Sequence, residues 1–476
     1  APEISPVTSV ATSAATSANK TIQPFVEPGL EVSTASYESV IVVATDFESA
    51  LHAVQSVQGT VTSQLWLIDA VGAQLSPAQI SRMAAMPGIV SITRNQRVEP
   101  AATFVKGTVD PMVWDLLDPA TLDVGANIAQ TTPWSGKSGI TGAGVTVAVV
   151  DSGVEFTDQV KGQVGAAVTQ HFRGQVDFID AGICSVTGAD VQQKSGYCQT
   201  GVNSSHDPYG HGSHIANTIL SRYTDLKSGA VLGIAPGADI LSIRVLGGNG
   251  GGNYEDVVEG IQYAVAQRSA LNIRVINLSL ISQATTPYFI DPVNRAVEAA
   301  WARGITVVVA AGNSGPNPQT VSVPGNDPYV ITVGALNGNG TPNQWEDDFV
   351  PTWSSSGPTL DGFIKPDVLA PGANVVSYLY NDANNLEKSA YLARFHPDYQ
   401  KNVPLYRLSG TSMATAVASG AVALLLEARP QLTPDQVKYR LMRTAKLFED
   451  ETGAPIYSYF RQGVGRIWIP DALFDD

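Results

Sequence analysis

Residues 145–153 read VTVAVVDSG, and this stretch decides the fold class. Its first six residues form a short run of β-branched side chains and Ala, with Thr146 as the one polar residue, which is typical of a strand buried on both faces. Four similar runs follow along the chain, and four segments with helical spacing of apolar residues alternate with them. The runs are 238–245, 273–278, 305–311 and 329–333, and the helical segments are 254–267, 292–302, 413–427 and 434–446. This alternation predicts an α/β fold in which helices cover both faces of a parallel sheet.

A second, smaller unit precedes the sheet. Apolar patterning over residues 38–93 predicts the order strand, helix, two strands, helix, strand, which is a ferredoxin-like βαββαβ unit. Residues 1–36 are rich in Ser, Thr, Ala and Pro without apolar periodicity, so we expect a loosely packed low-complexity tail there. The predicted domains are therefore a tail (1–36), a small domain (37–104) and a large domain (105–476).

Charge and hydropathy exclude several classes of partner. The chain of 476 residues has 28 Lys and Arg against 43 Asp and Glu, a net charge of −15. Nucleic acids and anionic membrane surfaces attract basic proteins, so neither is an expected partner. We also find no apolar run near the roughly 18 to 20 residues that span a bilayer. The composition predicts a soluble protein, and we expect a monomer.

The two cysteines point to an oxidising compartment. Cys184 and Cys198 are separated by 198 − 184 = 14 positions in a Gly- and Ser-rich stretch. A disulfide between them would stabilise the fold by roughly 3 kcal/mol, and such bonds are typical of exported proteins. The stretch that begins at Ala1 is of the kind that follows a removed signal peptide, so we expect secretion.

Three residues carry the chemistry of a nucleophilic enzyme. Asp151 directly follows a predicted strand, His211 lies in residues 210–214 (GHGSH), and Ser412 lies in residues 410–414 (GTSMA) where a helix begins. Ligand sites in parallel sheets lie beyond the carboxyl ends of the strands. A serine hydroxyl becomes a nucleophile when an imidazole takes its proton and a carboxylate orients that imidazole. The chain order Asp, His, Ser excludes the α/β-hydrolase order, because the last histidine, His396, precedes Ser412.

These motifs resemble the three active-site motifs of the subtilisin-like serine proteases, the subtilase family, and the resemblance extends over about 140–473. It implies a secreted serine endopeptidase that acts through an acyl-enzyme, with Asp151 as orienting acid, His211 as general base and Ser412 as nucleophile. Asn313, in residues 310–315 (AAGNSG), matches the family's oxyanion-hole asparagine. The small domain resembles the family's prodomain, a folding chaperone and inhibitor, so the chain is expected to be a self-processing zymogen.

The resemblance also implies where substrates bind. Two segments match those that flank an extended peptide, and a third set borders the pocket for the residue before the scissile bond (P1). These residues are Gly250, Gly251 and Gly252; Ser279, Leu280 and Ile281; and Ala311, Gly312 and Ser322. Because residues 320–325 carry no charge, we expect a preference for an apolar or aromatic P1 residue in the protein and peptide substrates.

Self-cleavage is expected near Phe104, an aromatic residue just after the last strand of the small domain. A later cut within 105–131 stays open, because the distance from Phe104 to Asp151, 151 − 104 = 47, is longer than is usual in the family.

The expected chemistry needs no catalytic cofactor. The family implies structural calcium, for which Asp158 is one candidate ligand, although no Asp-x-Asp-x-Asp-Gly loop fixes a site. His214 lies three residues after His211, but no further ligand completes a zinc site. Two other readings stay open: a non-catalytic scaffold that keeps its prodomain bound, and a serine-carboxyl peptidase with Glu in place of His, which the 210–214 motif disfavours.

Overall fold

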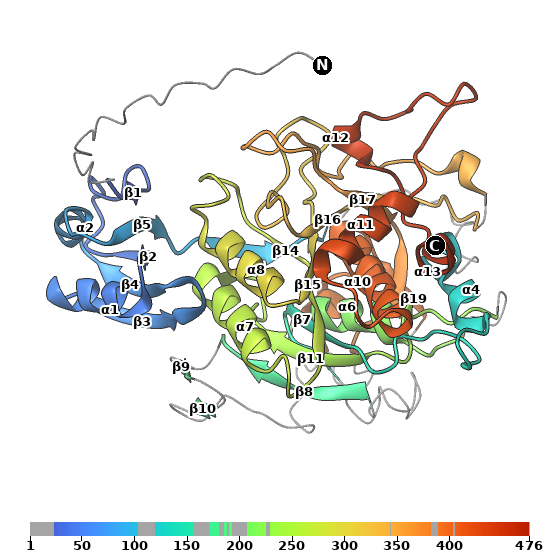
Figure 1. Ribbon diagram of the computed structural model, residues 1–476, viewed down its shortest axis with the longest axis horizontal. Helices are drawn as coiled ribbons and strands as arrows, with labels where there is room; N and C mark the ends of the chain where they lie inside the picture. The colour runs from blue at the N-terminus through green and yellow to red at the C-terminus, as the bar shows by residue number, and fades with distance from the viewer. Residues whose placement is uncertain are drawn as a thin grey trace, which may run out of the picture.

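A seven-stranded parallel sheet forms the centre of the large domain in the computed structural model (Figure 1). The strand order is β17-β16-β15-β13-β7-β11-β8. The strands are β7 (Thr146–Asp151), β8 (Phe172–Asp177), β11 (Asp239–Arg244), β13 (Ile273–Leu278), β15 (Thr306–Ala310), β16 (Ile331–Leu336) and β17 (Val368–Pro371). The structure describes residues 23–102, 120–155, 171–179, 185–187, 190–192, 207–224, 229–342, 344–381, 389–402 and 405–475.

Helices cover the sheet, which confirms the predicted α/β class. Two pairs of helices pack together, α7 with α8 and α6 with α10, and the two pairs lie on opposite faces (Figure 1). Their bounds are α6 (His211–Leu220), α7 (Tyr254–Ala266), α8 (Pro292–Ala302) and α10 (Thr411–Ala428). The burial of β7, β11, β15 and β16 along their whole length follows from this double cover.

Helix α10 runs through the core. It is long and apolar enough to span a membrane by length and composition, but 89% of its 18-residue apolar window is buried inside the fold. The neighbouring helix α11 (Pro434–Thr444) begins with a capping box between Thr433 and Gln436 and with Pro434 in its first turn.

Two strands of the sheet escaped the sequence analysis. The sequence of β8 is FRGQVD, in which charged and Gly residues break the apolar run, and β17 is only four residues long and ends in Pro371. Both lie at the edges of the sheet, where an unbroken β-branched pattern is not required.

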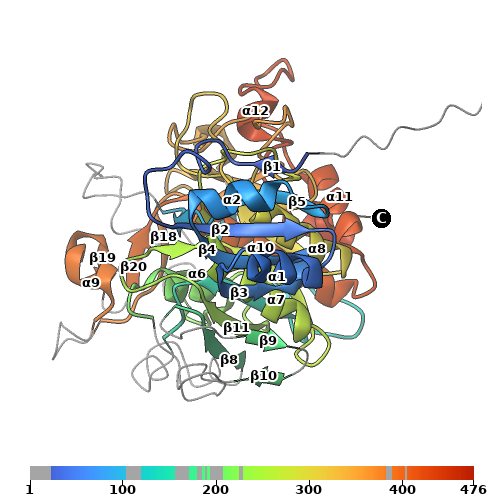
Figure 2. The same ribbon diagram turned by 90° about the vertical axis from the view of Figure 1, so that its left-hand side faces the viewer.

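The small domain has the expected order of elements. From β2 to β5 they are β2 (Glu38–Ala44), α1 (Phe47–Ser56), β3 (Thr60–Leu65), η1 (Trp66–Ile68), β4 (Ala70–Leu75), α2 (Pro77–Ala84) and β5 (Ile89–Arg94). The sheet order is β1-β5-β2-β4-β3, with β2 antiparallel to both β4 and β5. Figure 2 views the molecule from the side of this domain, with α1 and α2 in front of the large domain.

The expectation of loose packing over residues 1–36 differs from the structure in its second half. Phe25–Val26 forms β1, which pairs in parallel with β5, and the Leu30 side chain is fully buried. The Glu27 carboxylate accepts hydrogen bonds from the Arg94 backbone N–H (2.7 Å) and guanidinium (3.0 Å). A two-residue strand next to Pro24 is too short to show periodicity, so it could not be predicted from the sequence. Residues 1–22 lie outside the described residues.

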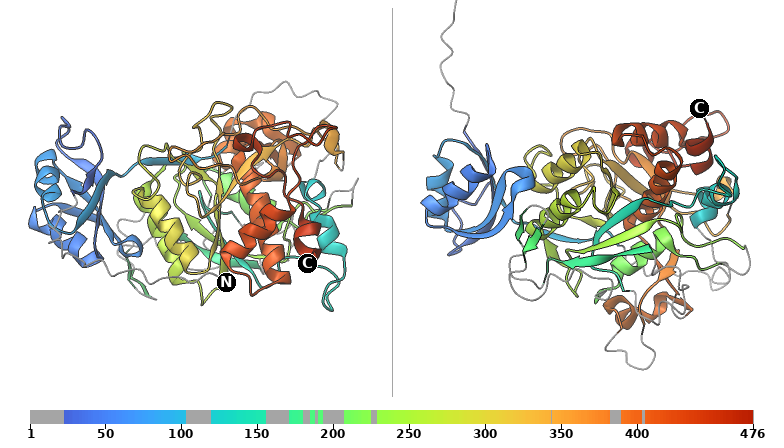
Figure 3. Two further views of the ribbon diagram at one scale, coloured as in Figure 1. Left: turned by 45° about the horizontal axis from the view of Figure 1, so that its top comes forward. Right: turned by 60° about the horizontal axis from the view of Figure 1, so that its bottom comes forward.

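A strand outside both main sheets connects the two domains. β6 (Arg97–Pro100) leaves the small domain after β5 and lies between β12 (Gly252–Asn253) and β14 (Leu280–Ile281) of the large domain. Figure 3 shows the small domain (blue) at one end of the large domain, joined through this region.

The remaining elements are short. A three-stranded sheet contains β18 (Val375–Tyr378), β20 (Leu405–Leu408) and β19 (Gln400–Asn402), with α9 (Tyr391–Phe395) and η6 (Pro397–Tyr399) beside it. The others are α3 (Ala120–Asp123), α4 (Ala126–Thr131), β9 (Ser185–Thr187), β10 (Asp190–Gln192), η4 (Trp345–Asp347), α12 (Tyr459–Gln462) and α13 (Ile469–Phe474).

The packing of residues 23–36 predicts a contrast between two neighbouring substitutions. Leu30→Ala removes a fully buried side chain from the small domain and should destabilise that domain by about 2–5 kcal/mol. Val32→Ala is the matched control, because Val32 is 81% exposed. Hydrogen exchange of the β2 amides, measured in the Ser412→Ala chain to prevent self-cleavage, should accelerate only for Leu30→Ala. Equal exchange in the two variants would contradict the packing of this segment.

Candidate active site

Three elements bring Asp151, His211 and Ser412 together. Asp151 is the last residue of β7, His211 is the first residue of α6, and Ser412 is the second residue of α10. All three side chains are fully buried. Asp151 Oδ1 lies 2.8 Å from His211 Nδ1 and also accepts a hydrogen bond from the Ser152 backbone N–H at 2.7 Å. This geometry can hold the imidazole with Nε2 free to accept a proton.

The nucleophile and the base are not yet in contact. His211 Nε2 has no hydrogen-bond partner within the described part of the chain. The Ser412 hydroxyl donates instead to the Ser279 carbonyl at 2.9 Å. For Ser412 to act as a nucleophile, its hydroxyl would have to turn from the Ser279 carbonyl towards His211 Nε2.

The Ser412 N–H and the Asn313 amide are the two donors expected to bind an oxyanion. The Ser412 backbone N–H donates to the Ala101 carbonyl at 3.1 Å. Asn313 Oδ1 accepts hydrogen bonds from the Thr411 N–H (2.9 Å) and hydroxyl (3.0 Å), which fixes the orientation of the amide. The buried Asn313 Nδ2 then has no partner among the residues that the structure describes. A preorganised buried donor without a partner is the kind of group that can stabilise developing negative charge.

Strand β6 lies in the substrate cleft between β12 and β14, as an extended peptide would. Val98 pairs with Gly252 on one side, and Pro100 pairs with Leu280 on the other, both antiparallel. The Ala101 N–H donates to the Ser279 carbonyl at 3.0 Å, and Ala101 is fully buried. Main-chain pairing on both edges holds a peptide regardless of its side chains.

The residues expected to bind substrate lie around this strand. Gly252 and Ile281 pair with β6 directly, and Gly250 and Gly251 belong to the turn before β12. The Ala311 carbonyl accepts from the Ser322 N–H at 3.0 Å. A cleft of about 760 Å³ beside β6 is lined in part by Ile281, Ser314, Thr320, Val321 and Ser322.

Gly312 lies close to the side chains of Ser322 and Ser355. Its φ of +111° is rarely adopted by other residues, and a Cβ there would lie 2.6 Å from Ser322 Oγ and 2.8 Å from Ser355 Oγ. A glycine is therefore required where the chain turns from β15 towards Asn313.

Other expected site residues lie outside the described residues. These are Phe104, Asp158, Cys184 and Cys198. The sequence analysis did not identify Ala101, whose carbonyl faces Ser412, or Thr411, whose hydroxyl orients Asn313. Thr411 stands in the motif directly before Ser412, but the sequence does not show that its hydroxyl contacts Asn313.

Asp207 is a further residue that the motif analysis missed. Its buried carboxylate accepts hydrogen bonds from the Ser152 hydroxyl (2.8 Å), the Gly210 N–H (2.7 Å) and the Ser213 N–H (2.8 Å). It therefore connects the residue after Asp151 to the start of α6. Burial raises the pKa of Asp207, although these three donors oppose that shift.

The buried surroundings of His214 indicate a structural role for this residue. Burial, with a smaller contribution from the nearby His211, lowers the pKa of His214 to about 3, so its imidazole is neutral. His214 Nε2 lies 3.3 Å from the Tyr406 carbonyl. No group of three or more His, Cys, Asp or Glu that could hold a metal occurs in the described ranges.

The small domain contacts helix α7 through polar groups. The Thr62 hydroxyl donates to Glu255 Oε1 at 3.0 Å. The Gln262 side chain accepts from the Leu67 N–H and donates to the Gln64 carbonyl, both at 3.0 Å. Gly72 allows the approach, because a Cβ there would lie 2.3 Å from the Glu255 carboxyl carbon.

Comparisons with known proteins agree with this geometry. Residues 142–465 match the model of the subtilase family. Serine protease AprX from Bacillus subtilis is 37% identical over 342 residues, which cover 71% of this chain and 68% of that protein. Subtilisin E from Bacillus subtilis is 30% identical, covering 65% of this chain and 62% of that protein. A thermostable alkaline protease from Halalkalibacterium halodurans is 27% identical and covers 86% of both chains.

A solved structure has the same fold. The crystal structure of fervidolysin from Fervidobacterium pennivorans, a keratinolytic enzyme related to subtilisin, superposes with a TM-score of 0.65 at 22% identity. The match covers 95% of this chain and 63% of fervidolysin. The chain therefore belongs to the subtilase family and is a serine protease of the subtilisin type.

Proposed function

We propose that the chain is a secreted serine endopeptidase made as a zymogen that cleaves itself and is inhibited by its own small domain. The observation that carries the proposal is the position of Ala101. Its N–H donates to Ser279, and its carbonyl accepts from the Ser412 N–H at 3.1 Å. A peptide bond bound in this way has its carbonyl carbon beside the nucleophile, as a substrate of an acyl-transfer enzyme requires.

The reaction uses four side chains. His211 Nε2 takes the hydroxyl proton of Ser412 while Asp151 holds the imidazole, and the Ser412 oxygen attacks the carbonyl carbon. The Ser412 N–H and Asn313 Nδ2 stabilise the resulting oxyanion. The imidazolium then donates its proton to the departing amine, and water hydrolyses the acyl-enzyme by the reverse sequence of proton transfers. No cofactor takes part in these steps.

We place the processing site at the Ala101–Ala102 bond, because Ala101 lies in the P1 position. Cleavage after Phe104 is the alternative, and it would require the chain to shift by three residues along the cleft. Export, a Cys184–Cys198 disulfide, a monomeric state and structural calcium remain part of the proposal. Recovery of the protein from the culture medium tests export, and a thiol titration, a sedimentation measurement and a calcium titration of the purified protein test the other three in turn.

Mass spectrometry of the purified chain tests the zymogen. The unmodified protein should lose an N-terminal fragment that ends at Ala101 and then hydrolyse a peptide anilide, whereas Ser412→Ala should stay intact and inactive. Cleavage after Phe104 instead would correct the site but keep the mechanism. If both proteins stay intact and inactive even after treatment with trypsin, the non-catalytic scaffold gains support.

The oxyanion contact predicts a kinetic effect at Asn313. Asn313→Ala should lower kcat about 10²- to 10³-fold, the loss found for the same donor in a subtilisin, with little change in KM. The donor acts mainly in the transition state, which is why kcat responds and KM does not. Asn317→Ala is the control, because it makes the same change at an exposed residue of the same loop. A tenfold rise in KM with unchanged kcat would argue against the oxyanion role.

The absence of charged residues in the segment 320–325 predicts the P1 preference. Peptides with Phe or Leu at P1 should have a higher kcat/KM than peptides with Arg or Glu, because a charged side chain would lose hydration without gaining an ion pair. A peptide library that varies only this position measures the preference. Equal or better cleavage after Arg would overturn it.

A further inference from the structure

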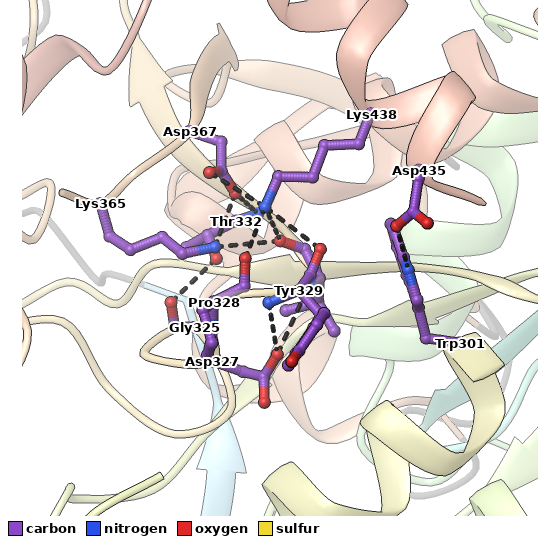
Figure 4. A network of polar contacts seen from close by, with 11 residues as sticks. Trp301, Gly325, Asp327, Pro328, Tyr329, Thr332, Lys365, Asp367, Asp435 and Lys438 are labelled. Atoms are coloured by element: carbon purple, nitrogen blue, oxygen red, sulfur yellow. Dashed lines mark hydrogen bonds and ion pairs between the residues drawn. The ribbon is translucent and has the colours of Figure 1, made fainter. Parts of the chain in front are cut away.

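The backbone carbonyls of three consecutive residues, 328–330, accept hydrogen bonds from one ammonium group (Figure 4). Lys438 Nζ, on α11, donates to the carbonyls of Pro328 (2.9 Å), Tyr329 (3.1 Å) and Val330 (2.9 Å). Asp367 Oδ1 lies 3.2 Å from the same nitrogen. The ammonium is therefore surrounded by four oxygens, and its side chain is 15% exposed.

A second lysine completes the cluster. Lys365 Nζ donates to the Val330 carbonyl at 2.9 Å and to Asp367 Oδ2 at 2.7 Å, and its side chain is 2% exposed. Burial lowers the pKa of Lys365 to about 7, although the Asp367 carboxylate opposes this shift. Asp367 Oδ2 also accepts from the Thr332 N–H at 2.8 Å, so one carboxylate binds both lysines and the start of β16.

The oxygens around Lys438 are of the kind that bind metal ions. Backbone carbonyls and carboxylates are the ligands of hard cations, and rings of carbonyls coordinate potassium. The distances of 2.9–3.2 Å suit an ammonium or a large monovalent cation. Calcium would need oxygens at 2.3–2.6 Å. In this chain the cation is a lysine side chain, supplied by the protein itself.

The lysine cluster binds the end of the segment 320–330, whose first three residues line the cleft beside β6. The Thr332 hydroxyl donates to the Gly325 carbonyl at 2.8 Å, and the Asn326 N–H donates to the Ser322 carbonyl at 3.0 Å. Val323 is paired in both directions with Ser282, the residue after β14. The segment that contains Ser322 is therefore held at two places. One is the pairing of Val323 with Ser282, and the other is the set of carbonyls at 328–330 that Lys438 binds.

Helix α11 is itself anchored. Asp435, in its first turn, accepts a hydrogen bond from the Trp301 indole N–H of α8 at 2.8 Å (Figure 4). This contact fixes the helix from which Lys438 reaches the carbonyls, so the ammonium is held in place rather than drawn in from solvent.

We propose that Lys438 serves as a built-in cation that positions the wall of the P1 pocket, in the place of a bound metal ion. Lys438 is a positioning residue, since it acts on substrate through residues 322–330. Removing its ammonium should leave a vacant site of carbonyl and carboxylate oxygens that a free monovalent cation can fill. The native enzyme should depend on no added cation at this site, whereas the variant should become dependent on one.

The test compares Lys438→Met in potassium, ammonium and choline chloride at equal ionic strength. Choline is too large to enter the vacated site and supplies no N–H donors. In choline, we expect KM for a peptide with an apolar P1 residue to rise roughly tenfold with kcat nearly unchanged, because ground-state binding is what the pocket wall supplies. Potassium or ammonium should restore KM to near the native value.

The control variant is Lys446→Met. It removes an ammonium group, just beyond α11, that pairs with Asp471 and donates to no carbonyl of the described residues. Its KM should be the same in the three salts. The same insensitivity in Lys438→Met, or a rise in KM that neither potassium nor ammonium reverses, would overturn the proposal.

A second measurement does not depend on catalysis. The inference rests on the proposed P1 pocket, so the melting temperature is also measured for Lys438→Met in the Ser412→Ala chain. Potassium or ammonium should raise it relative to choline, while the melting temperature of the Ser412→Ala chain alone should be equal in the three salts. If potassium stabilises the variant but KM does not respond, the cation site exists and the pocket assignment is wrong. If Lys438→Met folds poorly, soluble yield on refolding in the three salts provides the same comparison.

Discussion

The carboxyl ends of β15, β13 and β7 meet at one edge of the parallel sheet, and the rest of the site depends on this constraint. The three strands are neighbours, and the residues that follow or end them are Asn313, Ser279 and Asp151. The chain has no freedom to separate these groups without breaking the sheet. Helices α6 and α10 then bring His211 and Ser412 to the same edge through their first turns, where unpaired backbone N–H groups are available.

Unpaired polar atoms mark where the site is incomplete. Buried polar side chains normally have partners, yet Asp151 Oδ2, His211 Nε2 and Asn313 Nδ2 have none within the described residues. The other polar atom of each side chain has a partner: Asp151 Oδ1 lies 2.8 Å from His211 Nδ1, and Asn313 Oδ1 accepts from the Thr411 N–H and hydroxyl. The protein therefore keeps these atoms oriented without satisfying them, which is the preorganisation that an acyl-transfer site requires. The surrounding buried network stabilises this arrangement, and in it the Asp207 carboxylate accepts three hydrogen bonds.

The sequence predicted the elements whose pattern is local. The β-branched runs that became β7, β11, β13, β15 and β16 are buried on both faces, and the motif residues lie at the ends of elements. It could not predict β1, β6 or β17, because a short strand at an edge or in a cleft gains its pairing from a distant partner rather than from its own periodicity. The role of Ala101 was hidden for the same reason. The sequence favoured Phe104 because of its aromatic side chain, whereas the proposed cleavage after Ala101 rests on the backbone hydrogen bonds of Ala101 with Ser279 and Ser412. The lysine cluster was also invisible, since its oxygens come from backbone carbonyls.

The same register explains how a cleaved small domain could still inhibit. Two contacts hold it: the pairing of β6 in the cleft, and the docking of Thr62, Gln64 and Leu67 on α7. Only the two residues at positions 95 and 96 separate β5 from β6, so binding at one contact places the other at high effective concentration. Cutting after Ala101 would break the covalent connection to the large domain and leave both contacts intact. Release then requires both to open together, or proteolysis of the small domain, so cleavage and activation become separate events in the proposed zymogen.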